Sequence, residues 1–203
     1  LGDGCDSIYL LKQGFGVTSN EIDGVFLDKA LENAKVENVG LKTTSLDWRK
    51  LDTELAESSF DAVICLGNSL TYLFTEKDRL ETLRQFKRIL RNGGVLIIDE
   101  RNYQYILDNR EKILQGDFQY SGKYVYCGDK VHGRPVEISD SRVKMEYTDE
   151  RTGKKGYLIL YPFRRGDMKN LLAKTGFASI EEFSDYKVGE SHNADFYQYV
   201  CVK

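Results

Sequence analysis

The sequence predicts an α/β fold with a mostly parallel β-sheet and an inserted antiparallel β region. Up to about residue 107, short apolar runs alternate with helical patterns, which is typical of a parallel sheet joined by helices. From about residue 120 to 163 the pattern changes to short alternating runs separated by turn signals. This change of period predicts the antiparallel insertion.

The composition indicates one soluble domain with an insertion. The 203 residues carry a formal net charge of −3, and no run of basic residues indicates a nucleic-acid surface. No apolar segment approaches membrane-spanning length, and no signal peptide is recognisable. The four cysteines and two histidines lack metal-ligand spacing, so we expect a cytoplasmic protein without a metal.

The chain opens in a glycine turn over residues 1–7, before a helical pattern from Ile8 to Gln13. Glycines let the backbone approach a ligand closely, and the following helix offers free N–H groups. A doubly wound sheet has a central strand before such a turn. Because that strand is missing from the sequence, we expect that an N-terminal segment is absent.

The next predicted strand, Phe15–Ser19, is followed by Glu21. An acidic residue at this position accepts hydrogen bonds from ribose hydroxyls in nucleotide-binding βαβ units. Asp23 competes for this role, but the N-cap of a helix over Val25–Ala34 explains it better.

A third strand, Val39–Leu46, ends in Asp47 and Trp48. An acid beside an aromatic ring can hydrogen-bond an adenine amino group and pack against its ring. A loop aspartate and a core tryptophan explain the pair equally well from the residues alone.

The continuous apolar run Ala62–Leu66 predicts a strand buried on both faces of the sheet. It ends in Gly67-Asn68-Ser69. Because open α/β sheets bind ligands outside the carboxyl ends of their strands, we expect Asn68 and Ser69 to point at the ligand. The alternative is a turn that only caps the helix after Tyr72.

An amphipathic helix over Glu76–Leu90 is expected to end at Asn92-Gly93-Gly94, before a buried strand over Val95–Ile98. The polar block Asp99–Tyr103 stands at the carboxyl end of that strand. Within it, Arg101 can grip a carboxylate with two parallel hydrogen bonds, which suits an amino-acid substrate. Its position favours this role over a surface ion pair with Asp99 or Glu100.

The remaining elements are predicted from alternation and turn residues. They are strands at Lys123–Tyr126, Arg142–Tyr147 and Tyr157–Tyr161, turns at Cys127–Asp129 and Thr152-Gly153, a helix over Asp167–Thr175 stopped by Gly176, and strands at Ile180–Phe183 and Phe196–Val202 that return to the main sheet.

Taken together, the features at successive strand ends match the pattern of S-adenosylmethionine-dependent methyltransferases. The rival is a nicotinamide dinucleotide fold, which Ser7 weakens because it occupies the third glycine position of that fingerprint. More closely, the chain resembles glycine N-methyltransferases and the glycine/sarcosine N-methyltransferases of betaine synthesis. The blocks that carry the resemblance are Asp6-Ser-Ile, Gly14–Ser19, Phe60–Ser69 and Arg101–Leu107.

This resemblance implies a Rossmann-like class I methyltransferase fold with a reversed C-terminal strand. Residues 1–107 would form the cofactor-binding part, residues 108–163 the inserted substrate region, and residues 164–203 the closing helix and strands. The chain departs from the animal enzymes at Tyr72, which is a histidine there, and at Leu160, which is a tyrosine there.

The resemblance also implies roles for individual residues. Leu1, Gly2 and Gly4 would line the methionine part of S-adenosylmethionine. Glu21, an aspartate in many relatives, would bind the ribose, while Asp47 and Trp48 would hold the adenine. Leu66, Ser69 and Tyr72 would complete that pocket. Asn68 and Arg101 would bind the substrate carboxylate, and Tyr126 and Tyr147 would supply hydroxyls near the transferring methyl.

The expected reaction is direct methyl transfer to the amine of glycine or sarcosine, leaving S-adenosylhomocysteine and needing no metal. The expected partner is therefore a small amino acid, not a nucleic acid or a membrane. The first alternative is a methyltransferase of the same fold acting on another small amine or carboxylate. The second is a cofactor-binding protein without catalysis, because fold alone does not fix function.

Overall fold

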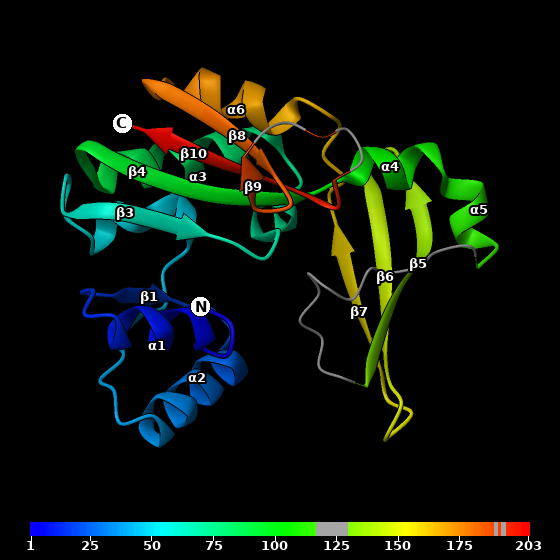
Figure 1. Cartoon of the computed structure of the whole chain (residues 1–203), viewed down its shortest axis with the longest axis horizontal. Helices are drawn as coiled ribbons and strands as arrows, with labels where there is room; N and C mark the ends of the chain where they lie inside the picture. The colour runs from blue at the N-terminus through cyan, green and yellow to red at the C-terminus, as the bar shows by residue number, and fades with distance from the viewer. Residues whose placement is uncertain (117–129, 189–190, 192–193) are drawn as a thin grey trace. The chain divides into compact units, whose positions relative to one another are not determined.

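The computed structural model describes residues 1–116, 130–188, 191 and 194–203. It divides into two compact units, residues 1–54 and residues 55–203 (Figure 1). The predicted domain boundaries at residues 107 and 163 both fall within the second unit and stay a prediction.

The first unit alternates helices and short strands. Its elements in chain order are α1 (Cys5–Lys12), β1 (Thr18–Asn20), α2 (Gly24–Val36), β2 (Lys42–Thr44) and the 3₁₀ helix η1 (Trp48–Thr53). β1 and β2 pair in parallel, as the alternating pattern predicted. Asp23 is the N-cap of α2, because its Oδ1 accepts hydrogen bonds from the N–H groups of Val25 and Phe26 at 2.8 and 3.3 Å.

Both strands of this unit are shorter than predicted. Phe15 lies outside β1 and is exposed, between two glycines that weaken an extended segment. After β2, the side chain of Asn20 takes over the pairing. It accepts from the N–H of Leu46 at 2.8 Å and donates to the Leu46 carbonyl at 2.9 Å. These two side-chain hydrogen bonds take the place of the backbone hydrogen bonds that a longer β2 would have made with β1.

The second unit is built on a five-stranded sheet in the order β3-β4-β10-β8-β9. The strands are β3 (Phe60–Cys65), β4 (Leu90–Arg101), β8 (Ser179–Ser184), β9 (Lys187–Val188) and β10 (Phe196–Val202). β3 and β4 are parallel, and β10 runs antiparallel to β4 (Figure 1). The predicted reversed C-terminal strand is therefore confirmed.

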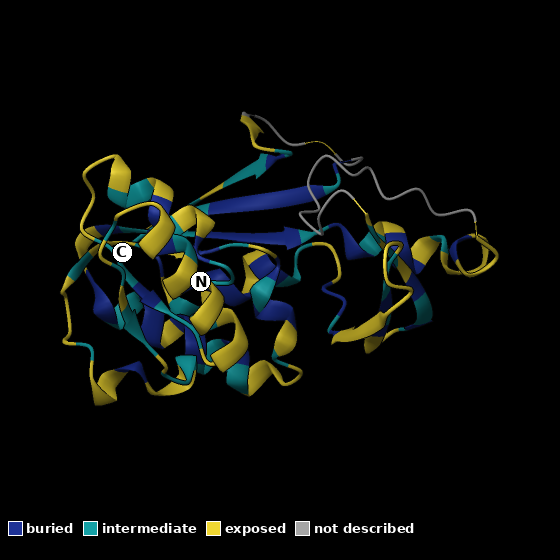
Figure 2. Ribbon diagram, turned by 90° about the horizontal axis from the view of Figure 1, so that it is seen from below, coloured by how far each residue is buried: buried dark blue, intermediate teal, exposed yellow. Residues whose placement is uncertain are grey.

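β3 is the edge strand of this sheet, and several of its residues are exposed. The prediction of a strand buried on both faces is wrong here, because β3 pairs with β4 alone among the described strands of its sheet. β10 lies between two partners and is buried along most of its length (Figure 2).

Two helices pack against each other beside the sheet: α3 (Glu76–Ile89), which connects β3 to β4, and α6 (Asp167–Thr175). α6 has the predicted bounds and ends at Gly176, whose φ of 78° is the left-handed conformation that closes many helices. The sheet and helices bury large apolar side chains such as Leu83, Ile98 and Leu172.

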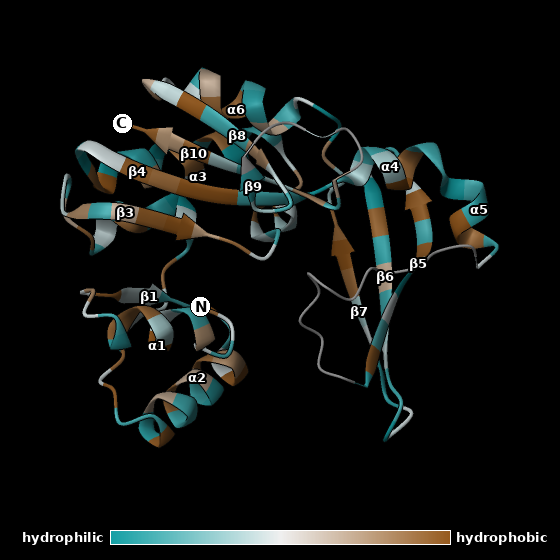
Figure 3. Ribbon diagram, in the orientation of Figure 1, coloured by the Kyte–Doolittle hydropathy of each residue, from teal (hydrophilic) through white to brown (hydrophobic). Residues whose placement is uncertain are grey.

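α3 does not run on to the predicted stop at Asn92-Gly93-Gly94. Its C-cap is Leu90, which is already extended and begins β4. The glycines fit instead into an irregular start of this strand, where a Cβ on Gly94 would meet the Arg91 carbonyl oxygen at 2.8 Å. The middle of β4 is apolar and its carboxyl end polar (Figure 3).

The inserted region is an antiparallel sheet in the order β5-β6-β7, flanked by short helices. Its elements are α4 (Tyr103–Asp108), α5 (Arg110–Leu114), β5 (Val131–Ser139), β6 (Arg142–Asp149) and β7 (Lys155–Leu160). α4 and α5 contact β5 and share a small hydrophobic core with the sheet. The predicted strand Lys123–Tyr126 and the turn at Cys127–Asp129 lie outside the described residues. Over the part of the chain that the structure describes, none of the helices is both long and apolar enough to span a membrane.

Candidate functional site

The loop after β3 has an unusual backbone that a neighbouring carboxylate holds in place. Gly67 and Asn68 have φ angles of 74° and 62°, both in the left-handed region. The carboxylate of Asp99, at the end of β4, accepts hydrogen bonds from the N–H of Gly67 at 3.1 Å and of Asn68 at 2.7 Å. The carboxyl ends of the two parallel strands are therefore joined through Asp99.

Asn68 follows the loop as the N-cap residue of the 3₁₀ helix η2 (Ser69–Tyr72), and its side chain is buried, with 9% exposed. Its Nδ2 donates to the hydroxyl of Tyr103 at 2.6 Å, while its Oδ1 accepts from the backbone N–H of Arg101 at 3.1 Å. The structure thus brings together Asn68 and Arg101, which the sequence placed on two different strand ends.

The guanidinium of Arg101 lies over the ring of Phe196, with 4.5 Å between Cζ and the ring centroid. Phe196 faces Arg101 across the β4–β10 pair. This cation–π contact holds a flexible side chain at the polar end of the sheet. Glu100, one of the two acids considered as ion-pair partners, instead accepts a hydrogen bond from the Tyr199 hydroxyl at 2.7 Å.

Two buried acids at the end of β4 have raised pKa values. Burial raises the pKa of Asp99, against the hydrogen bonds from Asn68, Gly67 and Tyr186 that favour its charged form. Burial likewise raises the pKa of Glu100 to about 8. Because successive strand residues point to opposite faces, the two carboxyl groups lie on opposite sides of the sheet.

In the first unit, the glycine turn and Glu21 are in direct contact. Gly4 has a φ of 88°, and a Cβ at this position would lie 3.0 Å from the Cβ of Ala30. Glu21 follows β1, as predicted, and its carboxylate accepts from the N–H groups of Gly2 and Asp23, each at 3.0 Å. The turn therefore offers a close backbone approach beside an oriented carboxylate.

Asp47 is the N-cap of η1, which Trp48 begins. Its carboxylate accepts from the N–H of Arg49 at 2.9 Å and pairs with the Arg49 guanidinium. The hydrogen bonds from the Arg49 side chain lower the pKa of Asp47 to about 2. The structure thus gives Asp47 a local capping role, and its predicted adenine contact remains a prediction.

The other predicted residues lie in the second unit. Ser69 donates from Oγ to the Leu66 carbonyl at 2.7 Å, and Tyr72, at the end of η2, is exposed. Tyr147 packs against the hydrophobic core of the inserted region. It faces Gly133 across the β5–β6 pair, where a Cβ would lie 2.7 Å from its ring. Tyr126 lies outside the described residues.

Sequence reasoning missed the parts of this arrangement that come from distant residues. Asp99 and Tyr103 were recognised as part of a polar block, but they were given no role in holding Asn68. Tyr186, whose hydroxyl donates to Asp99 at 3.3 Å, carries no signal in the local sequence that relates it to this strand end. The signal that was available is the position of Asp99 at the end of a buried strand.

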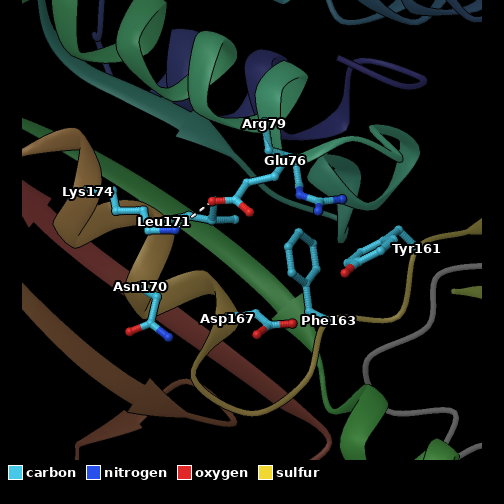
Figure 4. Close-up of a pocket in the computed structure, with 8 residues that line it drawn as sticks. All are labelled: Glu76, Arg79, Tyr161, Phe163, Asp167, Asn170, Leu171 and Lys174. Carbon is cyan, nitrogen blue, oxygen red and sulfur yellow. Dashed lines mark hydrogen bonds and ion pairs between the residues drawn. The ribbon is translucent and has the colours of Figure 1, made fainter. Parts of the chain in front are cut away.

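A pocket of about 140 Å³ lies between α3 and α6 (Figure 4). Its described lining includes none of the predicted site residues. Glu76 and Lys174 form an ion pair of 2.6 Å across it, and the guanidinium of Arg79 stacks over the ring of Tyr161 at 3.9 Å. The carboxyl ends of β3 and β4, where Asn68 and Arg101 meet, therefore remain the candidate site.

The chain is similar to known methyltransferases. Residues 1–94 match the family model described as a methyltransferase domain. The whole chain is 38% identical to a glycine/sarcosine N-methyltransferase of Aphanothece halophytica, of which it covers 73%. It is 37% identical to a protein of the same name from Halorhodospira halochloris, of which it covers 72%. A solved S-adenosylmethionine-dependent methyltransferase from Clostridium acetobutylicum has a TM-score of 0.74 at 18% identity, over 99% of this chain and 80% of that one.

Proposed function

The chain belongs to the glycine/sarcosine N-methyltransferase family, and from this premise we propose how its own residues bind and align the reactants. It is an S-adenosylmethionine-dependent N-methyltransferase that acts on glycine, sarcosine or both. The observation that carries this conclusion is the 36–38% identity to three proteins of that name along the entire chain. Its fold is that of the class I methyltransferases.

The first unit fits the cofactor. Gly4 lets the turn pack closely on Ala30 of α2, whereas a Cβ on Gly2 would meet nothing within 4 Å, which leaves the backbone at Gly2 open to a ligand. A carboxylate has about four lone-pair sites, and the two N–H groups bound to Glu21 leave acceptor capacity for a ribose diol. S-adenosylmethionine, when bound, supplies an electrophilic methyl group on a sulfonium centre.

We assign the cofactor contacts as the family resemblance implies. The turn would line the methionine part, Glu21 the ribose, and the η1 start the adenine. The β3 loop and η2 would complete the pocket. The residues concerned are Leu1, Gly2, Gly4, Glu21, Asp47, Trp48, Leu66, Ser69 and Tyr72.

Arg101 and Asn68 are the proposed clamp for the substrate carboxylate. Stacking on Phe196 restricts the Arg101 side chain, and its planar guanidinium can donate two parallel hydrogen bonds to a carboxylate. One Nδ2 hydrogen of Asn68 is used by Tyr103 and its Oδ1 by Arg101. The second Nδ2 hydrogen remains for the substrate.

The reaction requires a neutral amine in line with the methyl group. The amine would accept the methyl group that the bound cofactor supplies, with S-adenosylhomocysteine as the other product, and the proton left on nitrogen would pass to water. A carboxylate clamp fixes the other end of a glycine molecule, so the chain contributes mainly alignment. Alignment of this kind can supply about 7–11 kcal/mol of the barrier. The hydroxyls of Tyr126 and Tyr147 are proposed to face the positive charge around the methyl group.

Methyl transfer from isotope-labelled S-adenosylmethionine tests the proposal. We expect labelled product with glycine, sarcosine or both, and little with amines that lack a carboxylate. Dimethylglycine as acceptor shows how many methyl groups the protein adds. Transfer only to other small amines or carboxylates would support the alternative, and binding of the cofactor without transfer would contradict an enzymatic role.

A further inference from the structure

The turn between β8 and β9 contains a strained tyrosine. Asp185 and Tyr186 have φ angles of 50° and 59°, and the flanking residues Ser184 and Lys187 pair with each other. Two-residue turns of this kind favour Asn-Gly or Asp-Gly, because side chains rarely tolerate a positive φ. A bulky residue at the second position costs free energy, and such strain is found preferentially at functional sites.

The surrounding structure holds the turn in this conformation. The N–H of Tyr186 donates to the Oε1 of buried Gln198 at 2.7 Å. The Oδ1 of Asp185 accepts from the N–H groups of Asp195 and Phe196 at 2.9 and 3.0 Å, at the start of β10. These bonds fix the direction in which the tyrosine points.

The Tyr186 side chain contacts Asp99, which supports the candidate site. The Tyr186 hydroxyl donates to the Oδ2 of Asp99 at 3.3 Å, although 55% of the tyrosine remains exposed. Asp99 is only 2% exposed, and its carboxylate also receives the N–H groups of Gly67 and Asn68. A continuous series of hydrogen bonds therefore runs from Tyr186 through Asp99 to Asn68.

We propose that Tyr186 is a positioning residue of the acceptor site, where its hydroxyl orients Asp99 and thereby fixes Asn68 for the substrate carboxylate. This inference rests on the proposed function. It gives a reason for a tyrosine at a position where glycine would relieve the strain.

The groups around Asp99 make the role measurable through pH. Asp99 faces the Tyr186 hydroxyl, the two backbone N–H groups and the charge of Arg101, with Cys65 and Glu100 as its other ionisable neighbours. The hydroxyl favours the charged carboxylate, so its loss raises the pKa of Asp99 further. A protonated Asp99 accepts the N–H groups of Gly67 and Asn68 less well. Because protonation then occurs at a higher pH, the acidic limb of the pH profile of kcat/KM for glycine moves to higher pH.

Three variants separate strain from function. Tyr186→Phe removes only the hydroxyl, and Tyr186→Gly removes both the strain and the hydroxyl. Ser58→Gly is the matched control, because Ser58 has a φ of 53° in an exposed loop before β3. We expect both glycine variants to raise Tm. We expect both Tyr186 variants, but not Ser58→Gly, to lower kcat/KM for glycine by about tenfold, chiefly through KM. Tyr186→Phe should also show the shifted acidic limb.

The outcomes distinguish this inference from the proposed function. If the unchanged protein transfers no methyl group to glycine or sarcosine, the proposed function is wrong, and the role of Tyr186 in positioning the acceptor is wrong with it. If the unchanged protein is active and both Tyr186 variants match Ser58→Gly in kcat/KM and pH profile, the turn is structural and the inference is wrong.

Discussion

The carboxylate of Asp99 accepts the backbone N–H of Asn68 at 2.7 Å, and this bond connects the ends of two parallel strands. Asn68 sits in the left-handed region, so its conformation depends on partners that hold it there. Its side chain in turn contacts the backbone of Arg101. The geometry of the proposed acceptor site therefore depends on a carboxylate that needs no contact with the substrate.

The first prediction replaces this carboxylate by an amide. Asp99→Asn keeps the shape but leaves one of the two loop N–H groups facing an NH₂ donor. We expect the free energy of unfolding to fall by about 1–3 kcal/mol, as for an unsatisfied buried donor, and kcat/KM for glycine to fall as well. Urea unfolding and steady-state kinetics measure both. Asp61→Asn is the control, because this carboxylate is exposed; equal losses in the two variants would contradict the role of Asp99.

The second prediction concerns Glu21. Glu21→Ala should weaken the binding of S-adenosylmethionine by about 1.5–3 kcal/mol, because a ribose diol loses a charged acceptor. Isothermal titration calorimetry gives the dissociation constant. Asp23→Ala is the matched control, which should destabilise α2 by about 1 kcal/mol through loss of its N-cap and leave the affinity nearly unchanged. Weaker binding in the control alone would mean that Asp23 holds the ribose.

The third prediction follows from the raised pKa of Glu100. Its pKa is about 8 in the folded protein against an ordinary value of 4.5, so the folded state binds the proton more tightly. This contribution to stability is complete below pH 4.5 and is lost as the pH rises to about 8. Glu100→Gln should remove this loss, which we expect to be on the order of a few kcal/mol.

Urea unfolding at several pH values across this window tests the third prediction. The variant should gain stability relative to the unchanged protein as the pH rises. Glu181→Gln, on strand β8 of the same sheet, is the control because its side chain is exposed. A constant difference between Glu100→Gln and the unchanged protein at all pH values would show that Glu100 ionises normally.

Local signals predicted the parts of the fold that depend on nearby residues. The end of α6 follows from a glycine stop and the bounds of β10 from a run of mostly aromatic and apolar residues, and the structure confirms both. β5 was missed because Gly133 and Pro135 interrupt its pattern. The structure accommodates both: Gly133 makes room for the ring of Tyr147, and the register shifts after Pro135. Neither the contact of Gly133 with Tyr147 nor the register shift after Pro135 can be recognised from the sequence around β5.

The same distinction applies to the candidate site. Positions at strand ends could be predicted for Asn68 and Arg101, because the apolar runs before them define where each strand ends. The contact between them and their support by Asp99 could not be predicted, since these bonds join residues more than 30 positions apart. The Asp185-Tyr186 turn carries no glycine or asparagine and therefore gave no turn signal.

Arg101 is the residue proposed to clamp the substrate carboxylate, and a conservative substitution tests this role. Lysine keeps the charge but presents a point donor on a flexible stem, so Arg101→Lys should misalign the amine. We expect kcat/KM for glycine to fall by about a hundredfold, with little change in the affinity for S-adenosylmethionine.

The measurement that decides the role of Arg101 is steady-state kinetics with glycine and glycine methyl ester, on the unchanged protein and on Arg101→Lys. The ester lacks the anionic group, so it should be a poor substrate for the unchanged protein and lose little more in the variant. Equal efficiency toward acid and ester in the unchanged protein would contradict the clamp and favour a methyltransferase for another small amine.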